Sequence, residues 1–279
     1  MYGSKASQSG ESPARQRPVT LSTLAKMKAE GEKIACLTAY DAAFARVEEA
    51  AGVDLVLVGD SLGMVIQGHA TTVPVTMDHM EYHTRCVAAG LHIPLLVADM
   101  PFVSYADPQR AVDNAARLMR AGAGMVKLEG AAGQAEVIAA LAGQGIPVCA
   151  HLGLRPQSVH KAGGFRVQGR DEAAADAMRQ DARDLVAAGA DLLLLECVPR
   201  DLAQRITAEA EVPVIGIGAG AGVDGQILVV HDMLGIPPGR KPRFVENFMA
   251  ESDSVDAAIS AYVQAVKDGR YPCDEHGFD

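Results

Sequence analysis

The sequence predicts an α/β protein of the (β/α)8 TIM-barrel class. Eight short apolar runs recur along the 279 residues, and they lack the alternation of half-exposed strands. Such continuous runs are typical of parallel strands that are covered on both faces. Amphipathic segments separate most of them, and a repeated strand–helix order closes into a barrel of about this length. The runs are 34–39, 54–59, 94–99, 124–129, 146–151, 191–196, 213–218 and 226–231.

Two of the intervening segments carry clear helix signals. Residues 107–122 predict a helix because Asp107 can cap its first turn, Pro108 suits the first helical position and Gly122 can end it. The segment 171–189 also predicts a helix, and it ends at Gly189 in the same way.

Three connections depart from the regular pattern. Only residues 219–225 separate the last two runs, which is too short for an ordinary crossover helix. The connections 60–93 and 152–190 are long. We expect these two to fold over the mouth of the barrel.

Composition excludes several classes of protein. A formal net charge of −10 argues against nucleic-acid binding, which needs a basic face. The five cysteines are scattered and form no C-x-x-C motif, which favours a reducing, cytoplasmic setting over disulfides or zinc. No apolar stretch is long enough for a membrane helix. Residues 1–17 are polar and predict a disordered tail, which leaves 18–279 as one catalytic barrel domain.

Acids follow four of the predicted strands. The segments AGVDLVLVGD, AGAGMVKLEG and AGADLLLLEC form a weak repeat that ends in Asp60, Glu129 and Glu196, and Asp99 ends a further strand. Barrels place their chemistry at the carboxyl ends of the strands. One such acid alone would more simply cap the next helix. Four acids together with Lys127 favour an active site.

Three of these acids suit a metal ion. Asp60, Asp99 and Glu129 come from successive strands, which lie about 4.8 Å apart, so their carboxylates could converge on one Mg²⁺. In the run MVKLEG, Lys127 points to the same face as Glu129. An ammonium beside a metal ion would stabilise an anion such as an enolate.

Glu196 is the predicted general base. It ends the sixth strand, and we expect it across the barrel from the metal ligands. Its apolar surroundings should raise its pKa toward the range of a base. A metal ion and a lysine opposite a carboxylate base are suited to removing a proton next to a carbonyl group.

Other motifs leave alternatives open. His79 and His83 lie one helical turn apart and could bind a metal, although the sequence is not H-E-x-x-H. The glycine-rich residues 216–222 miss the dinucleotide pattern and could either grip a phosphate or allow close packing. His151 could bond to the substrate or to a neighbouring backbone group.

These residues occur within blocks that closely resemble the ketopantoate hydroxymethyltransferase family. The similarity runs from about residue 20 to the DEHGF ending. The matching blocks are TAYD, LVGDSLGM, TTVPVTMDHMEYHT, VADMPF, MVKLEG, HLGLRPQSV, GGFRVQGR, LLECVP, VIGIGAG and DGQILVVHDMLG.

The resemblance implies a barrel of the phosphoenolpyruvate-binding superfamily type, assembled as a homodecamer. It also implies transfer of a hydroxymethyl group from 5,10-methylenetetrahydrofolate to 3-methyl-2-oxobutanoate, giving 2-dehydropantoate for pantothenate and coenzyme A synthesis. The implied residue roles are Mg²⁺ binding by Asp60, Asp99 and Glu129, ketoacid binding by Asp60, Ser61, Asp99 and Lys127, and proton acceptance by Glu196.

Two other functions remain as alternatives. A Mg²⁺-dependent carbon–carbon lyase of the isocitrate lyase or phosphonopyruvate type would use the same enolate chemistry without folate. A non-catalytic metabolite-sensing barrel would not need a base opposite the metal.

Overall fold

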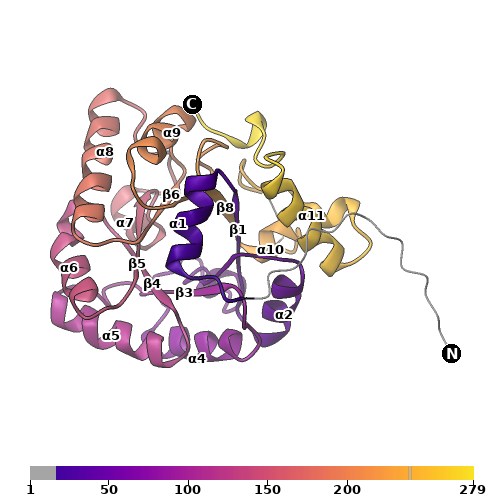
Figure 1. Ribbon diagram of the computed structural model, residues 1–279, viewed down its shortest axis with the longest axis horizontal. Helices are drawn as coiled ribbons and strands as arrows, with labels where there is room; N and C mark the ends of the chain where they lie inside the picture. Colours follow the sequence, from indigo (N-terminus) through magenta and orange to yellow (C-terminus); the bar gives the residue numbers. More distant parts are fainter. Residues whose placement is uncertain (1–16, 238, 240) are drawn as a thin grey trace.

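Eight parallel strands close into one barrel in the order β1 to β8, as the sequence predicts (Figure 1). The computed structural model describes residues 17–237, 239 and 241–279. The predicted tail therefore lies outside the described residues except for Arg17. The strands are β1 (Ile34–Thr38), β2 (Leu55–Val58), β3 (Leu95–Asp99), β4 (Met125–Glu129), β5 (Val148–Gly153), β6 (Leu192–Glu196), β7 (Val214–Ile217) and β8 (Gly225–Leu228).

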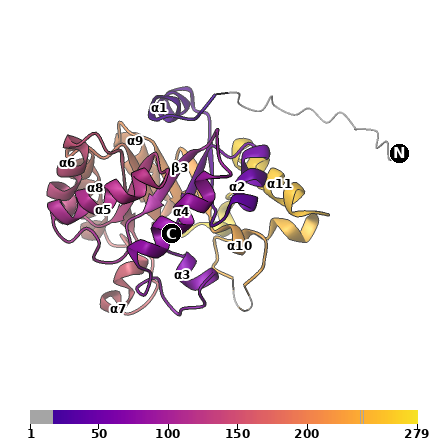
Figure 2. The ribbon, with the colours of Figure 1, turned by 90° about the horizontal axis from the view of Figure 1, so that it is seen from below.

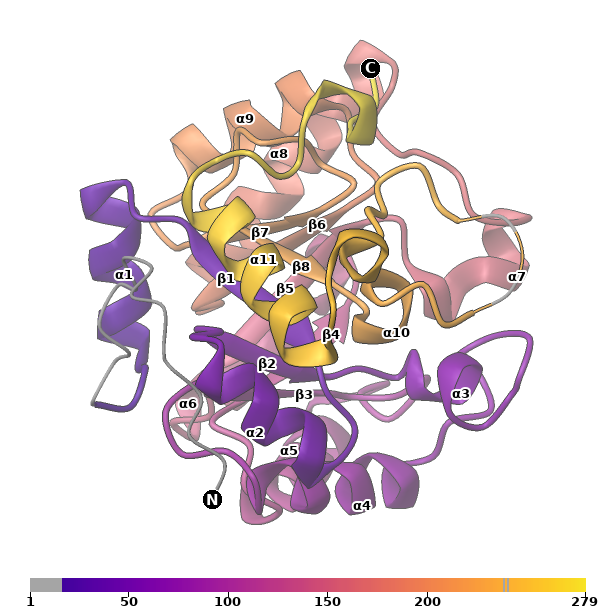
Figure 3. The same cartoon turned by 90° about the vertical axis from the view of Figure 1, so that its right-hand side faces the viewer.

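Helices surround the barrel, and α11 packs along the outside of β1 (Figure 3). As predicted, no helix lies between β7 and β8. The helices are α1 (Leu21–Glu30), α2 (Ala42–Ala50), α3 (Leu62–Val65), α4 (Met77–Ala88), α5 (Pro108–Arg120), α6 (Ala135–Gly143), α7 (Val159–Ala162), α8 (Glu172–Ala187), α9 (Arg200–Glu209), α10 (Val230–Met233) and α11 (Val255–Lys267).

The helix signals in the sequence have the predicted physical cause. The Asp107 side chain accepts a hydrogen bond from the Arg110 amide at the start of α5, and Asp171 accepts one from the Ala174 amide at the start of α8. These bonds satisfy amide groups that have no partner inside the helix.

The eighth strand is shorter than its apolar run. It ends at Leu228, and Val230 begins α10, so the prediction that the strand continues to His231 is wrong. The Val230 amide donates to the hydroxyl of Thr38 on β1, and this bond supports the turn out of the strand.

The long connections cover the mouth of the barrel only in part. Residues 61–72 and 154–167 contribute side chains to the cavity described below, whereas α4 and α8 belong to the outer ring of helices. Figure 2 shows α3 and α7 at one end of the barrel and α1 at the other.

The core lies in two parts. One lies between the strands and the outer helices, and the other fills the amino end of the barrel interior. There Val19, Leu24 and Met27 pack against inward-facing side chains such as Ile34 and Met125. Helix α1 therefore closes this end of the barrel. Among the described helices, none has the length and hydropathy to cross a bilayer.

Candidate active site

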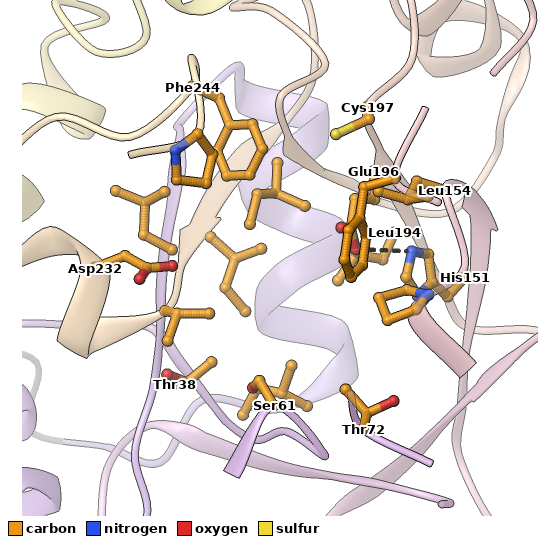
Figure 4. A pocket seen from close by; sticks show the side chains of 18 of the residues that line it. Thr38, Ser61, Thr72, His151, Leu154, Leu194, Glu196, Cys197, Asp232 and Phe244 are labelled. Atoms are coloured by element: carbon orange, nitrogen blue, oxygen red, sulfur yellow. Dashed lines mark ion pairs between the residues drawn. The ribbon is translucent and has the colours of Figure 1, made fainter. Parts of the chain in front are cut away.

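A cavity of about 550 Å³ opens at the carboxyl end of the strands. In Figure 4, Glu196 and His151 lie on one side of this cavity, Asp232 and Phe244 on the other, and Thr38 and Ser61 below them. Every residue predicted to form the site lines it. These residues are Asp60, Ser61, Asp99, Lys127, Glu129, His151 and Glu196.

Strand register brings the charged residues together. Asp99 is paired with Lys127 across β3 and β4, and Glu129 is paired with His151 across β4 and β5. Lys127 and Glu129 are both 5% exposed, so the buried face predicted for MVKLEG is confirmed. Burying two charged side chains costs free energy unless each is paired or neutralised.

An ion pair with Asp99 compensates the charge of Lys127. Nζ of Lys127 lies 2.5 Å from Oδ1 of Asp99, and Oδ2 of Asp99 accepts a hydrogen bond from the Asp60 amide at 2.9 Å. Burial alone would lower the pKa of Lys127, but the carboxylates of Asp99, Glu129 and Asp60 outweigh burial and raise it. Lys127 therefore stays protonated.

Among the described residues, neither Asp60 nor Glu129 has a lysine or arginine within ion-pair distance. Burial, reinforced by the charge of Asp99, raises the pKa of Asp60 to about 7. Burial also raises the pKa of Glu129 well above its ordinary value, against the opposing effect of Lys127. Four acids and one lysine line the cavity, and the raised pKa values favour the neutral, protonated forms of Asp60 and Glu129. A bound cation would instead favour their ionised forms.

The donor set fits Mg²⁺ in chemistry and charge, because the acids offer only oxygen ligands. Within the ranges that the structure describes, however, no three Asp, Glu, His or Cys side chains are arranged around one metal position. Asp99 instead faces Lys127. The Mg²⁺ ligands therefore stay a prediction.

Glu196 ends β6, which lies opposite β2 and Asp60 in the closed barrel, as expected. On the shorter side of the barrel, His151 of β5 lies between Glu196 and Glu129. Nε2 of His151 lies 3.3 Å from Oε2 of Glu196, and Nδ1 lies 3.8 Å from Oε1 of Glu129. Glu196 is thus only two strands from the nearest predicted ligand.

The predicted pKa shift of Glu196 is confirmed. Burial raises its pKa to about 8, although Lys127 acts in the opposite direction. Burial and the charge of Lys127 lower the pKa of His151, so the imidazole is neutral. Neither ring nitrogen of His151 makes a hydrogen bond of ordinary geometry to a described residue, but the backbone of Leu154 interacts with the imidazole and opposes the lowering of its pKa. Both roles considered for His151 therefore stay open.

Sequence reasoning missed Gln157, which lies behind the cavity and is 4% exposed. Its side-chain amide donates to Oδ2 of Asp60 at 2.8 Å and to the carbonyl oxygen of Met100 at 3.0 Å. Its side-chain oxygen accepts from the hydroxyl of Tyr105, and its backbone amide donates to Oε2 of Glu129 at 3.1 Å. One residue therefore fixes two of the acids.

The other motifs have structural roles. His79 and His83 lie on α4, as their spacing suggests, but they have separate partners. Nδ1 of His79 accepts from the Thr76 amide, whereas Nδ1 of His83 lies 2.8 Å from the carbonyl oxygen of Tyr40. In the glycine-rich segment, a Cβ at Gly218 would lie 2.8 Å from Phe244 and 3.1 Å from Phe278, so close packing is the observed use of this glycine.

Comparison with known proteins identifies the family. The family model described as ketopantoate hydroxymethyltransferase matches residues 18–274. The chain belongs to the ketopantoate hydroxymethyltransferase family. The family consists of enzymes, so the prediction of an enzyme is confirmed.

Two relatives, both named 3-methyl-2-oxobutanoate hydroxymethyltransferase, illustrate the match. The protein from Alkalilimnicola ehrlichii is 61% identical over 270 residues, which cover 96% of this chain and 98% of the relative. The protein from Thiobacillus denitrificans is 61% identical over 262 residues, covering 94% and 100%.

Solved structures share the fold of this family member at low sequence identity. A phosphonopyruvate hydrolase complex with oxalate and Mg²⁺ has a TM-score of 0.58 at 16% identity, over 75% of this chain and 80% of the other. A 2,3-dimethylmalate lyase, described as a member of the PEP mutase/isocitrate lyase superfamily, has a TM-score of 0.56 at 17% identity, over 77% and 82%. These likenesses show that the barrel fold is shared.

Proposed function

We propose that the protein transfers a hydroxymethyl group from 5,10-methylenetetrahydrofolate to 3-methyl-2-oxobutanoate, with Mg²⁺ as its cofactor. Water completes the reaction, and the products are 2-dehydropantoate and tetrahydrofolate. The names of the relatives support the ketoacid and the transferred group. The cavity supports the chemistry, because it combines a buried carboxylate of raised pKa with a buried ammonium.

One observation carries the proposal. Glu196, with a pKa of about 8, faces the same cavity as the Lys127–Asp99 pair. A carboxylate of raised pKa is a competent base near neutral pH, and a nearby ammonium stabilises the negative charge that proton removal creates.

The residues would divide the reaction between them. Asp60, Asp99 and Glu129 would hold Mg²⁺, which when bound supplies a positive charge that polarises the ketoacid. Ser61 and Lys127 would contact the ketoacid oxygens, with Ser61 oriented by Tyr40, whose hydroxyl lies 2.8 Å from Oγ of Ser61. Glu196 would accept the proton from C3, and the resulting carbanion would attack the methylene carbon of the folate as one of its two C–N bonds breaks. Water would then replace the second C–N bond, which supplies the hydroxyl group and releases tetrahydrofolate.

A turnover assay tests the function directly. Ketopantoate formation should require both Mg²⁺ and 5,10-methylenetetrahydrofolate. Cleavage of a 2-hydroxy or phosphono acid without folate would instead support the lyase alternative, which the fold of the solved structures also allows.

Proton exchange isolates the base. The wild type with Mg²⁺ should exchange the C3 hydrogen of the ketoacid with deuterated water in the absence of folate, as followed by NMR. Glu196→Gln should slow exchange by roughly 10²–10⁴-fold, the usual effect of losing a general base, while ketoacid binding survives. The wild-type rate at low ketoacid should rise as the pH passes through about 8, because only ionised Glu196 accepts a proton. Wild-type exchange in the variant would identify another base, with His151 the next candidate.

We also propose that the protein acts in the cytoplasm as a homodecamer. The free thiols of all five cysteines support a reducing compartment, and the family resemblance supports the assembly.

A further inference from the structure

The outer part of the cavity has a different character from its acidic floor. Phe244 and Phe278 lie against Gly218 at the end of β7, and the guanidinium of Arg243 lies 5.8 Å from the centre of the Phe278 ring. Arg166 and Lys241 are both exposed and line the same cavity. We refer to these two residues, Arg243 and the two phenylalanines as the rim. A small branched ketoacid held at the floor would leave this part of the 550 Å³ cavity free, since pockets of about 300–1,000 Å³ hold much larger ligands.

Two of the cations have no carboxylate partner. Within the described ranges, Arg166 and Lys241 form no ion pair. Arg243 is engaged elsewhere, because it donates to the carbonyl oxygen of Glu275 and acts on the carboxylate of Asp279. The charges of Arg166 and Lys241 are therefore available to an anionic ligand.

An acceptor faces the cavity from the same side as the rings. Asp232, on α10, points its carboxylate into the cavity beside Phe244 (Figure 4). This carboxylate accepts no hydrogen bond from another residue in the described part of the chain. A carboxylate accepts well from two neighbouring N–H groups on the edge of a ring.

We propose that this rim is the binding subsite for the folate co-substrate. Asp232 accepts from the N–H edge of the pterin ring, Phe244 and Phe278 pack against its apolar surface, and Arg166 and Lys241 bind the carboxylates of the glutamate tail. The inference rests on the proposed function, because that function supplies a ligand with a heteroaromatic ring and an anionic tail. It explains why aromatic rings, an acid and unpaired cations line one rim.

Two probes separate the parts of the subsite. Tetrahydrofolate carries the ring and the tail, whereas 6-methyltetrahydropterin carries the ring alone. Titration calorimetry on the full chain, with Mg²⁺ and saturating ketoacid present, measures both dissociation constants. Neither probe carries a methylene group, so no turnover occurs.

The double variant Arg166→Gln with Lys241→Gln tests the tail contacts. Tetrahydrofolate should bind about tenfold more weakly, and the pterin should bind as in the wild type, because exposed ion pairs each contribute modestly. Raising the salt concentration should weaken tetrahydrofolate binding less in this variant. Asp232→Asn should weaken both probes by a similar factor while ketoacid affinity stays within about twofold.

A matched control removes two positive charges elsewhere. Arg179 and Arg183 on α8 both pair with Glu209 and lie outside the cavity, so Arg179→Gln with Arg183→Gln should bind both probes normally. Equal weakening in this control would reduce the effect to net charge and overturn the subsite.

Other outcomes also separate the possibilities. Unchanged tetrahydrofolate binding in the Arg166 and Lys241 variant would place the tail elsewhere. If the Arg166 and Lys241 variant loses ketoacid affinity by the same factor as tetrahydrofolate affinity, the two cations attract anions in general and do not form a folate subsite. If the wild type binds the ketoacid but not tetrahydrofolate, the proposed co-substrate and its subsite are both wrong. If the wild type turns over normally and the variants bind both probes as the wild type does, the subsite alone is wrong.

Discussion

Replacing Gln157 by leucine should weaken both the fold and ketoacid binding. The substitution keeps the backbone amide that donates to Glu129 but removes the side-chain amide. Three buried groups then lose a partner: Oδ2 of Asp60, the carbonyl oxygen of Met100 and the hydroxyl of Tyr105. At about 1–3 kcal/mol for each unsatisfied buried group, the free energy of unfolding should fall by about 3 kcal/mol or more.

The effect on binding follows from Asp60. Without its hydrogen bond from Gln157, this carboxylate is no longer fixed toward the cavity. A hydrogen bond to a charged group contributes about 1.5–3 kcal/mol, so ketoacid affinity in the presence of Mg²⁺ should fall by about tenfold or more. Urea unfolding measures the first effect and titration calorimetry the second.

Gln226 provides the matched control. It is equally buried, at 4% exposed, but among the described residues its side-chain amide donates only to the carbonyl oxygen of Gly220, away from the acids. Gln226→Leu should therefore cost about 1–3 kcal/mol of stability and leave ketoacid binding unchanged. If the Gln157 variant is no less stable than this control and binds the ketoacid normally, the positioning role is refuted.

Three further predictions concern the metal, the core and the assembly. Asp99→Ala and Glu129→Ala should each abolish ketoacid binding at ordinary Mg²⁺ concentrations while circular dichroism shows an intact fold; unchanged affinity by calorimetry would remove these residues from the metal site. Glu48 is fully buried, neither carboxyl oxygen has a partner within the described residues, and burial raises its pKa well above the ordinary value. The folded state thus holds this proton more tightly than the unfolded state. The free energy of unfolding of the wild type should therefore decline as the pH rises above about 4.3, by up to about 1.4 kcal/mol per pH unit. Glu48→Met should reduce that slope in urea unfolding measured between about pH 5 and 8. Light scattering at micromolar protein should give the mass of about ten chains, and a monomer mass would contradict the decamer.

The sequence predicted the barrel because its strands are buried on both faces. Their apolar runs are continuous, and the acids that end them lie at one rim whatever the details of packing. Lys127 and Glu129 could be assigned to the same face from their spacing alone, and both are buried. Local patterns are sufficient where a position follows from strand geometry.

Local sequence patterns could not predict contacts between segments that are distant in the sequence. Gln157 meets Asp60 across 97 positions of sequence, and nothing around it distinguishes it from a loop glutamine. Glu48 lies in a helix where an acid would ordinarily face solvent. The sequence also could not decide whether Asp99 turns toward a metal ion or toward Lys127, because both arrangements neutralise the same charge.

The closure of the barrel by α1 bears on the kinetic mechanism. Because Val19, Leu24 and Met27 fill the amino end of the interior, ligands exchange with solvent at the carboxyl end, where the cavity opens. With the proposed ketoacid at the floor and the proposed folate at the rim, both ligands would share one route. We therefore expect compulsory-order kinetics, in which the ketoacid binds before the one-carbon donor and tetrahydrofolate departs before 2-dehydropantoate.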